Sequence, residues 1–137
     1  YRKIRGYSFE TVMENIRRFI EARRAKGGKI PLLYMSMTLM RSNIEEVLEF
    51  IDLAVELGAD SVYLWHLNHW PEAEMRRYVV EREGWVFDYE KEGLWNFPAL
   101  SNRYLRKAEA LAREKGIRLY LDHHKRVYFD EREAGRA

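Results

Sequence analysis

Three segments of the chain share one order of features: the end of a helix-like stretch, a glycine, and the start of an apolar run. They are RRAKGGKIP at 23–31, AVELGADSV at 54–62 and AREKGIRLY at 112–120. Glycine ends helices because it adopts a left-handed backbone at no steric cost. Parallel strands need a long crossover, usually a helix, so this repeated junction is typical of α/β folds. The sequence therefore predicts a parallel sheet with alternating helices.

The residues around these junctions define the elements. A capping residue precedes each expected helix and a glycine follows it: Ser8 and Gly27, Ser42 or Asn43 and Gly58, Ser101 and Gly116. Ser42 with Glu45, or Asn43 with Glu46, fits a capping box. The expected strands are KIPLLYMSMTL at 29–39, SVYLWHL at 61–67 and IRLYLD at 117–122. The first is so continuously apolar that we expect both of its faces to be covered.

The pattern loosens between about residues 68 and 99. PEAEMRRYVVERE at 71–83 favours a short helix with proline at its first position, whereas GWVFDYEKEGLWNFP at 84–98 has no period. We interpret this region as an insertion or lid.

Length and composition limit the rest. The 137 residues, 47% of them hydrophobic, fit a single α/β module over 1–137. A net charge of +2 argues against nucleic acid or an anionic membrane as partner, and the absence of cysteine excludes thiolate metal sites. No apolar run is long enough to span a membrane, so a cytoplasmic location is expected. The chain starts without methionine and close to a helix, which suggests a piece of something longer.

The expected strands form either a small open sheet or an arc of a (β/α) barrel. Such an arc leaves two sheet edges exposed, and exposed edges recruit partners. We therefore expect a homodimer or a strand swap through these edges.

Polar residues gather where the expected strands end, which is where ligands bind in parallel α/β folds. The three clusters are Thr38, Arg41, Ser42 and Asn43; Trp65, His66, Asn68 and His69; and Asp122, His123 and His124. Ser42 and Asn43 also fit plain helix caps, and Arg41 fits a solvated loop cation. His66, Asp122 and His123 could instead bind a divalent metal.

Several stretches together resemble the second half of the barrel of radical SAM enzymes, especially the SPASM-related peptide and cofactor maturases. They are RGYSFETVMENIRRF at 5–19, TLMRSNIEEVLEFIDLAVELGAD at 38–60 and SVYLWHL at 61–67, with a looser match over 100–122. The resemblance implies S-adenosylmethionine and a [4Fe-4S] cluster in a parent protein. The CxxxCxxC motif that holds the cluster is missing, so this chain alone should hold no cofactor and be inactive.

The resemblance also implies roles for single residues. Arg5 matches an arginine that reaches the methionine carboxylate in some members of the family. Cofactor contacts are implied for Thr38, Arg41, Asn43, His66 and Leu67, and substrate contacts for His69, Asp122 and His123. The substrate would be a small molecule or a peptide.

Two other functions remain open from the sequence. One is a metal-dependent isomerase-like barrel fragment using His66, Asp122 and His123, in which a cation polarises a carbonyl. The other is a non-catalytic domain that binds a protein through its sheet edge and its aromatic lid.

Overall fold

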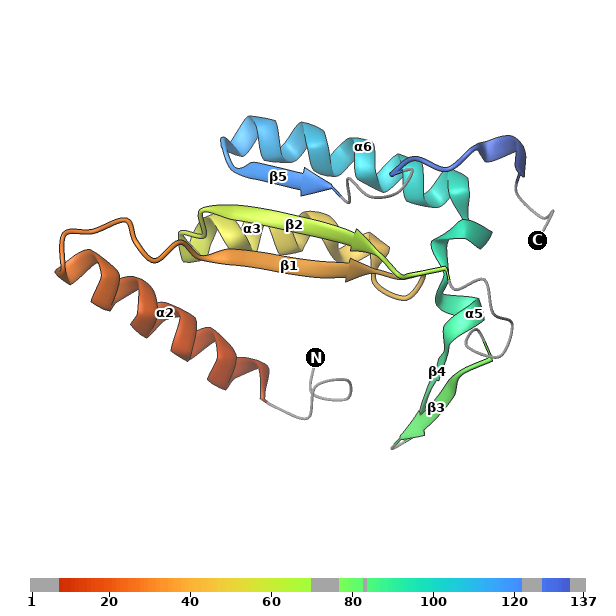
Figure 1. Cartoon of the computed structure of the whole chain (residues 1–137), viewed down its shortest axis with the longest axis horizontal. Helices are drawn as coiled ribbons and strands as arrows, with labels where there is room; N and C mark the ends of the chain where they lie inside the picture. Colours follow the sequence, from red (N-terminus) through yellow and green to blue (C-terminus); the bar gives the residue numbers. More distant parts are fainter. Residues whose placement is uncertain (1–7, 70–76, 83, 122–126, 134–137) are drawn as a thin grey trace.

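The chain folds around a small parallel sheet (Figure 1), seen in a computed structural model that describes residues 8–69, 77–82, 84–121 and 127–133. The sheet has three strands in the order β1-β2-β5, and both pairs are parallel. A separate antiparallel pair, β3-β4, belongs to the insertion. The predicted α/β class with parallel strands and alternating helices is confirmed.

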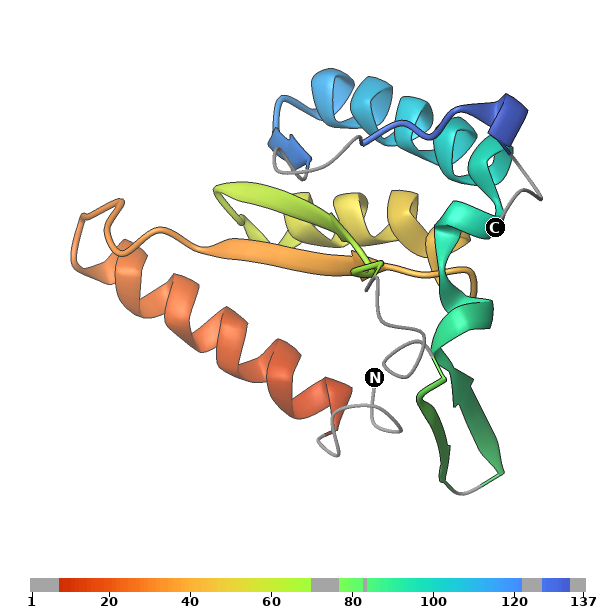
Figure 2. The same ribbon diagram turned by 45° about the vertical axis from the view of Figure 1, so that its right-hand side comes forward.

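The first helix, α2 (Phe9–Ala25), begins and ends where the sequence predicts. The Ser8 hydroxyl accepts a hydrogen bond from the Thr11 amide, and the chain leaves the helix through Lys26 and through Gly27 at φ +64°. Only Met13 and Ile20 of this helix are buried. In Figures 1 and 2, α2 lies beside β1 on the side away from β2.

Strand β1 (Tyr34–Leu39) leads through the short 3-10 helix η1 (Ile44–Glu46) into α3 (Val47–Leu57), which ends at Gly58 with φ +75°. The predicted capping box does not form, because no side chain caps the start of η1 or α3. The Asn43 amide turns back instead and binds the backbone at the end of β1.

Strand β2 (Ser61–His66) is followed by the insertion, then by α6 (Pro98–Lys115) and β5 (Arg118–Leu121). Helix α6 starts at Pro98, so the expectation of a Ser101 cap is wrong. Proline suits a first helical position because its fixed φ matches the helix and its missing N–H has no partner there. Ser101 is buried inside the helix.

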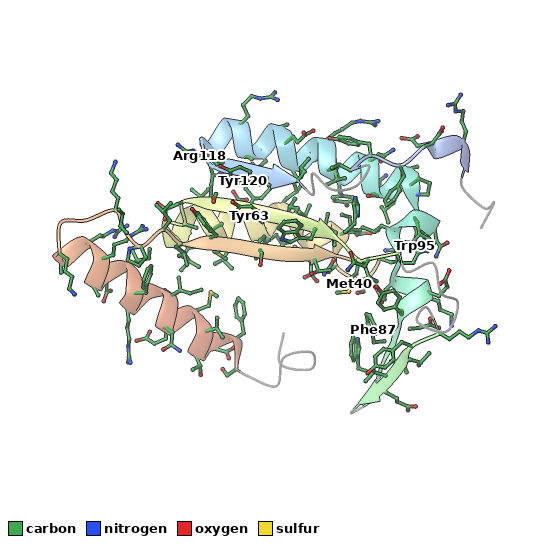
Figure 3. The ribbon with its side chains drawn as sticks, viewed as in Figure 1. Met40, Tyr63, Phe87, Trp95, Arg118 and Tyr120 are labelled. Atoms are coloured by element: carbon green, nitrogen blue, oxygen red, sulfur yellow. The ribbon has the colours of Figure 1, made fainter. Side chains whose placement is uncertain are left out.

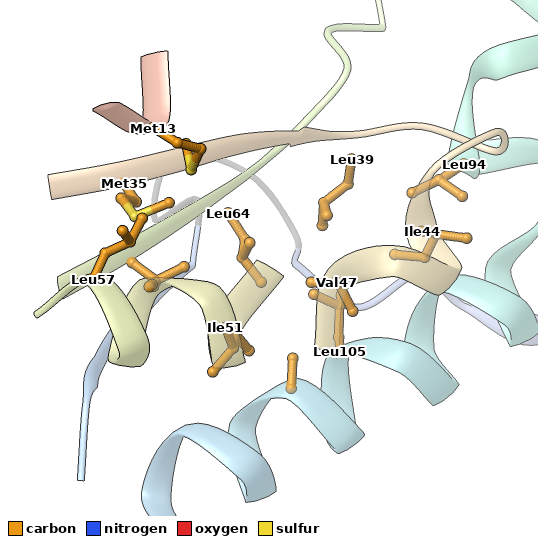
Figure 4. Close-up of a cluster of buried hydrophobic side chains, with 13 residues drawn as sticks. Met13, Met35, Leu39, Ile44, Val47, Ile51, Leu57, Leu64, Leu94 and Leu105 are labelled. Carbon is orange, nitrogen blue, oxygen red and sulfur yellow. The ribbon is translucent and has the colours of Figure 1, made fainter. Parts of the chain in front are cut away.

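The sheet has one covered face and one open face. Helices α3 and α6 pack on the covered face (Figure 2), and the core lies between them and the sheet (Figure 4). The most deeply buried core side chains are Leu39, Ile44, Val47, Ile51, Leu64 and Leu105. On the open face Tyr34 remains 52% exposed, so the expectation that β1 is covered on both faces is wrong.

The insertion contains a β-hairpin at 79–82 and 85–88, where a short helix was expected over 71–83. Strands β3 (Val79–Arg82) and β4 (Trp85–Asp88) pair around Gly84 at φ +73°, and α5 (Tyr89–Glu92) and η2 (Leu94–Asn96) follow. The expectation of helix over 71–83 is wrong for 79–82, and residues 71–76 lie outside the described part.

The insertion is tied to the loop after β1. The Glu92 carbonyl accepts from the Arg41 amide and its carboxylate accepts from the Ser42 amide, both at 2.9 Å. At its end, Gly93 lies so close to the Trp95 indole that a Cβ there would be 2.0 Å from a ring carbon. The chain therefore needs glycine at this turn for steric reasons.

A last short helix, η3 (Glu131–Glu133), closes the described part of the chain. Among the described residues, none of the helices combines the length and the apolar character that crossing a bilayer requires.

Candidate ligand face

The open face of the sheet carries a mixture of aromatic, hydroxyl and basic side chains. Side chains alternate between the two faces along each strand, and the register places Ser36 beside Tyr63 and Thr38 beside Trp65. Tyr120 lies beside Tyr63 on the other side. The members of this face that are not buried are Tyr34, Ser36, Thr38, Tyr63, Trp65, Arg118 and Tyr120.

Aromatic rings run across all three strands of the open face. The Tyr63 ring stacks on Tyr120 at 4.6 Å between centroids with 14° between the planes, and on Trp65 at 5.8 Å with 11°. Tyr34 meets Tyr63 from β1 at 5.5 Å. Figure 3 shows Tyr63, Tyr120 and Arg118 on the neighbouring strands β2 and β5. Desolvation raises the pKa of Tyr63 above its usual value, and the nearby Tyr120 and Tyr34 add to the rise.

The residues predicted to contact a cofactor do not all lie at one cavity, although Thr38 and Asn43 line the same one. Thr38 lies on the open face, where it is exposed. The Asn43 side chain donates to the Thr38 carbonyl at 2.9 Å and accepts from the Met40 amide at 2.8 Å, so it holds the strand end together. Arg41 pairs with Glu45 at 3.8 Å and lies over the Phe97 ring at 5.4 Å.

His66 lies on the opposite face of the sheet from Thr38. It is 7% exposed, its Nε2 is 2.9 Å from the Val127 carbonyl, and its ring meets Phe129 at 4.7 Å between centroids. Leu67 contributes a backbone bond, its amide donating to the Leu39 carbonyl at 3.3 Å. Thr38 and Asn43 line one cavity beside β1, whereas His66 is not among its lining residues, so the predicted grouping is wrong for His66.

The remaining predicted residues lie elsewhere. His69 belongs to the insertion contact, with its ring against Trp95 at 4.6 Å between centroids. Arg5, Asp122 and His123 lie outside the described residues. Within the described ranges, no cluster of three or more His, Asp or Glu side chains could hold a metal ion.

One structural site was missed from the sequence. Asn102 of α6 is 2% exposed and binds the backbone of Phe129 twice, donating to its carbonyl at 2.8 Å and accepting from its amide at 2.9 Å. Tyr128 beside it donates to the Glu109 carboxylate, and burial together with this carboxylate raises the pKa of Tyr128 to about 12. The sequence signal for this site was Asn102 itself, a polar residue on the same helix face as the apolar Leu105, Ala108 and Ala112.

Comparison of the chain with protein-family models, with curated proteins and with solved structures finds no match. The open face is therefore interpreted from its own chemistry.

Proposed function

We propose that this chain is one wall of a radical SAM-type barrel, and that its open sheet face borders the S-adenosylmethionine and substrate cavity of the parent protein. The observation that carries the proposal is the two-sided sheet. Its strands follow one another in chain order, its helices α3 and α6 cover one face, and the other face presents hydroxyls and flat rings. A barrel wall needs this division, because its outer face packs on helices and its inner face meets the cavity.

The residues of the open face fit a nucleoside better than they fit a metal. The near-parallel rings of Tyr63 and Trp65 offer a surface on which a flat base can stack, and Ser36 and Thr38 offer hydroxyls nearby. The iron–sulfur cluster is different, because the sequence has no cysteine to ligate it. The cluster ligands of the proposed enzyme must come from residues outside this sequence, and the chain by itself is inactive.

The residues proposed to line the cavity differ from those predicted from the sequence. Thr38 remains, and Ser36, Tyr63 and Trp65 join it because they share its face. His66 and Asn43 are assigned to holding the fold, since His66 lies 2.9 Å from the Val127 carbonyl and packs against Phe129, and Asn43 binds the end of β1. The engagement of His66 by the Val127 carbonyl also gives no support to a metal site that includes this histidine.

The binding part of the proposal is tested by titrating the isotope-labelled chain with S-adenosylhomocysteine and following amide shifts by NMR. Weak but saturable shifts are expected at Ser36, Thr38 and Trp65, in keeping with a chain that does not retain the cofactor on its own. Trp65→Ala should weaken binding by about 5- to 150-fold because a stacked base is worth about 1–3 kcal/mol. Val55→Ala is the matched control, because this apolar side chain is exposed on α3, away from the open face. Shifts that avoid the open face would contradict the proposal.

The family part is tested separately by reading the gene upstream of the Tyr1 codon. The proposal expects a CxxxCxxC motif encoded there in the same reading frame. A complete upstream frame without this motif would overturn the radical SAM assignment, even if the open face binds a nucleoside.

A further inference from the structure

Strand β1 is at the edge of the described sheet, and helix α2 lies beside that edge. The strand order is β1-β2-β5, so β1 has a described neighbour on one side only. Helix α2 lies on the other side, away from β2 (Figures 1 and 2). A cavity of about 950 Å³ is lined by β1, α2 and α3, and the β3-β4 hairpin also contributes to its lining. The cavity and the edge of the sheet therefore lie along the same strand.

The backbone of β1 has unpaired hydrogen-bonding groups at this edge. The Leu33 and Leu39 carbonyls accept amides from the β2 side at 2.9 and 3.3 Å, so odd-numbered residues direct their backbone groups toward β2. In a parallel ladder the residues between them point the other way. The N–H groups of Tyr34, Ser36 and Thr38 therefore point away from β2, where no described strand pairs with them. Unpaired backbone groups beside a largely apolar cavity favour an added strand, because burying them without partners costs free energy.

The connections of the sheet indicate where such a strand comes from. Helix α3 joins β1 to β2, and α6 leads from the insertion after β2 to β5, so the chain advances in one direction while both helices cover the same face. Nearly all parallel crossovers of this kind are right-handed. Helix α2 precedes β1 and packs against α3, with Met13 in the core cluster of the covered face (Figure 4). A right-handed crossover through α2 therefore starts from a strand on the free side of β1.

Helix α2 has an apolar side that the described residues cover only in part. Met13 and Ile20 are its buried residues. Val12 and Ile16 line the cavity together with Phe50 of α3. A crossover helix packs on both of the strands that it joins, and only one of the two is described here. The apolar lining that α2 contributes to the cavity therefore fits a second strand beside β1.

The segment before Ser8 is too short to supply this strand by itself. Strand β1 has six residues, and the loop from a strand to the next helix usually has about 2–6 residues. Seven residues precede Ser8. A strand as long as β1 together with even the shortest such loop needs more than that, so part of the strand belongs to sequence before Tyr1.

We propose that the polypeptide preceding Tyr1 supplies a strand, called here the upstream strand, that runs parallel to β1, pairs with its free edge and is joined to it through α2. Its residues on the covered side are apolar, because they pack against Val12, Ile16 and Phe50. Its other residues extend the open face beside Ser36 and Thr38. The inference needs a parallel α/β sheet and not the radical SAM assignment, so the two can fail separately.

The test compares amide hydrogen exchange, followed by NMR, in the 137-residue chain and in a chain extended by about 20 of the residues that its gene encodes before Tyr1. The amides of Ser36 and Thr38 should exchange about tenfold more slowly or better in the extended chain, because they gain partners. The amides of Met35 and Met37 are the internal control, because they already point toward β2 and should change less. An extension with the same residues in scrambled order should leave Ser36 and Thr38 exchanging as in the 137-residue chain.

Two variants locate the pairing. Ser36→Pro removes an N–H that the upstream strand would use and no bond to β2, so it should lower the urea midpoint of the extended chain more than that of the 137-residue chain. Ser36→Ala keeps this N–H and should shift both midpoints equally.

Unchanged exchange of Ser36 and Thr38 in the extended chain, or equal slowing by the scrambled extension, would overturn the proposal. So would a reading frame that starts at or just before the Tyr1 codon. Slower exchange at Ser36 and Thr38 in a protein whose upstream frame lacks CxxxCxxC would support this inference while overturning the radical SAM assignment.

Discussion

At the scale of single residues, Asp60 organises one end of the sheet. Its carboxylate accepts from the Leu33 amide at 2.7 Å and from the Arg23 guanidinium at 2.6 Å, so it joins the end of α2, the start of β1 and the start of β2. The two charged side chains are only 10% and 28% exposed. Burial by itself would raise the pKa of Asp60, but the bonds from Leu33 and Arg23 prevail and hold it below 3.8.

Asp60→Asn is expected to lower the free energy of unfolding by about 1–3 kcal/mol at pH 7, because it weakens two charge-assisted hydrogen bonds. A lowered pKa in the folded state means that this contribution is complete above the ordinary value of 3.8 and is lost as the pH falls through the folded-state value. Urea denaturation at pH 7 and at successively lower pH should therefore show the variant and parent converging in acid.

The matched control is Glu14→Gln, which breaks an exposed pair with Arg18 whose side chains are 53% and 72% exposed. Its effect should stay within about 0.5 kcal/mol at every pH. A deficit for Asp60→Asn that persists unchanged in acid would contradict the assigned role of the charge.

At the scale of elements, segment 127–133 is held to the body of the fold by apolar packing of Val127, Tyr128 and Phe129 on the core and by a set of polar contacts. Asn102 binds the Phe129 backbone and the Glu131 carboxylate, and His66 lies 2.9 Å from the Val127 carbonyl. Residues of both helix α6 and strand β2 therefore hold this segment in place.

Asn102→Ala should lower the free energy of unfolding by about 1–3 kcal/mol, because it leaves buried groups of Phe129 without partners. Hydrogen–deuterium exchange should rise locally at 127–130 while strand β1 keeps its protection. Glu114→Ala, an exposed change on the same helix, should leave both quantities unchanged. Uniformly faster exchange throughout the sheet would indicate that Asn102 acts on the whole fold instead.

The elements also show what could be predicted from the sequence. Gly58 and Gly116 end α3 and α6 at positive φ, which is a local signal in the sequence. The helix ends and the strands that follow them could therefore be predicted. The hairpin was missed although valine and aromatic residues flank Gly84, because its short strands lack a clean alternation. Asn43 was interpreted as a helix cap from its spacing to Glu46. Spacing alone cannot show that its side chain binds the Thr38 carbonyl and the Met40 amide instead.

The candidate site was harder to predict for a related reason. Trp65 and His66 are neighbours at the end of β2, so their side chains lie on opposite faces of the sheet. From the sequence, either the face with Val62, Leu64 and His66 or the face with Tyr63 and Trp65 could be the buried one. Only packing against α3 and α6 decides that His66 points inward and Trp65 outward. The contact between Asn102 and Phe129 joins residues 27 positions apart, which no local pattern encodes.

At the scale of the whole molecule, the two faces of the sheet differ in how deeply their side chains are buried. Leu39, on the covered face, is 1% exposed, whereas its neighbour Thr38 is exposed on the open face. The core side chains of β1 and β2, Met35, Leu39, Val62 and Leu64, all lie on the covered face, so substitutions there are expected to cost more stability than those at exposed positions of the open face.

Leu39→Ala is expected to cost about 2–5 kcal/mol of unfolding free energy because it leaves a cavity in the core. Thr38→Ala should cost less than about 1 kcal/mol, the range that separates residue types on exposed strands. Chemical denaturation of both variants measures the contrast. Equal losses at the two positions would mean that something covers the open face in solution.

Helix α2 has one more consequence, for the chain during its synthesis and refolding. Sheets with exposed edge strands tend to pair edge to edge and to build insoluble fibres, because each added chain presents a new edge strand to the next. In this chain helix α2 lies beside β1, on the side away from β2, and so hinders the approach of a further chain to that edge (Figures 1 and 2). Deleting α2 is therefore expected to expose the β1 edge and to increase aggregation, which light scattering would measure.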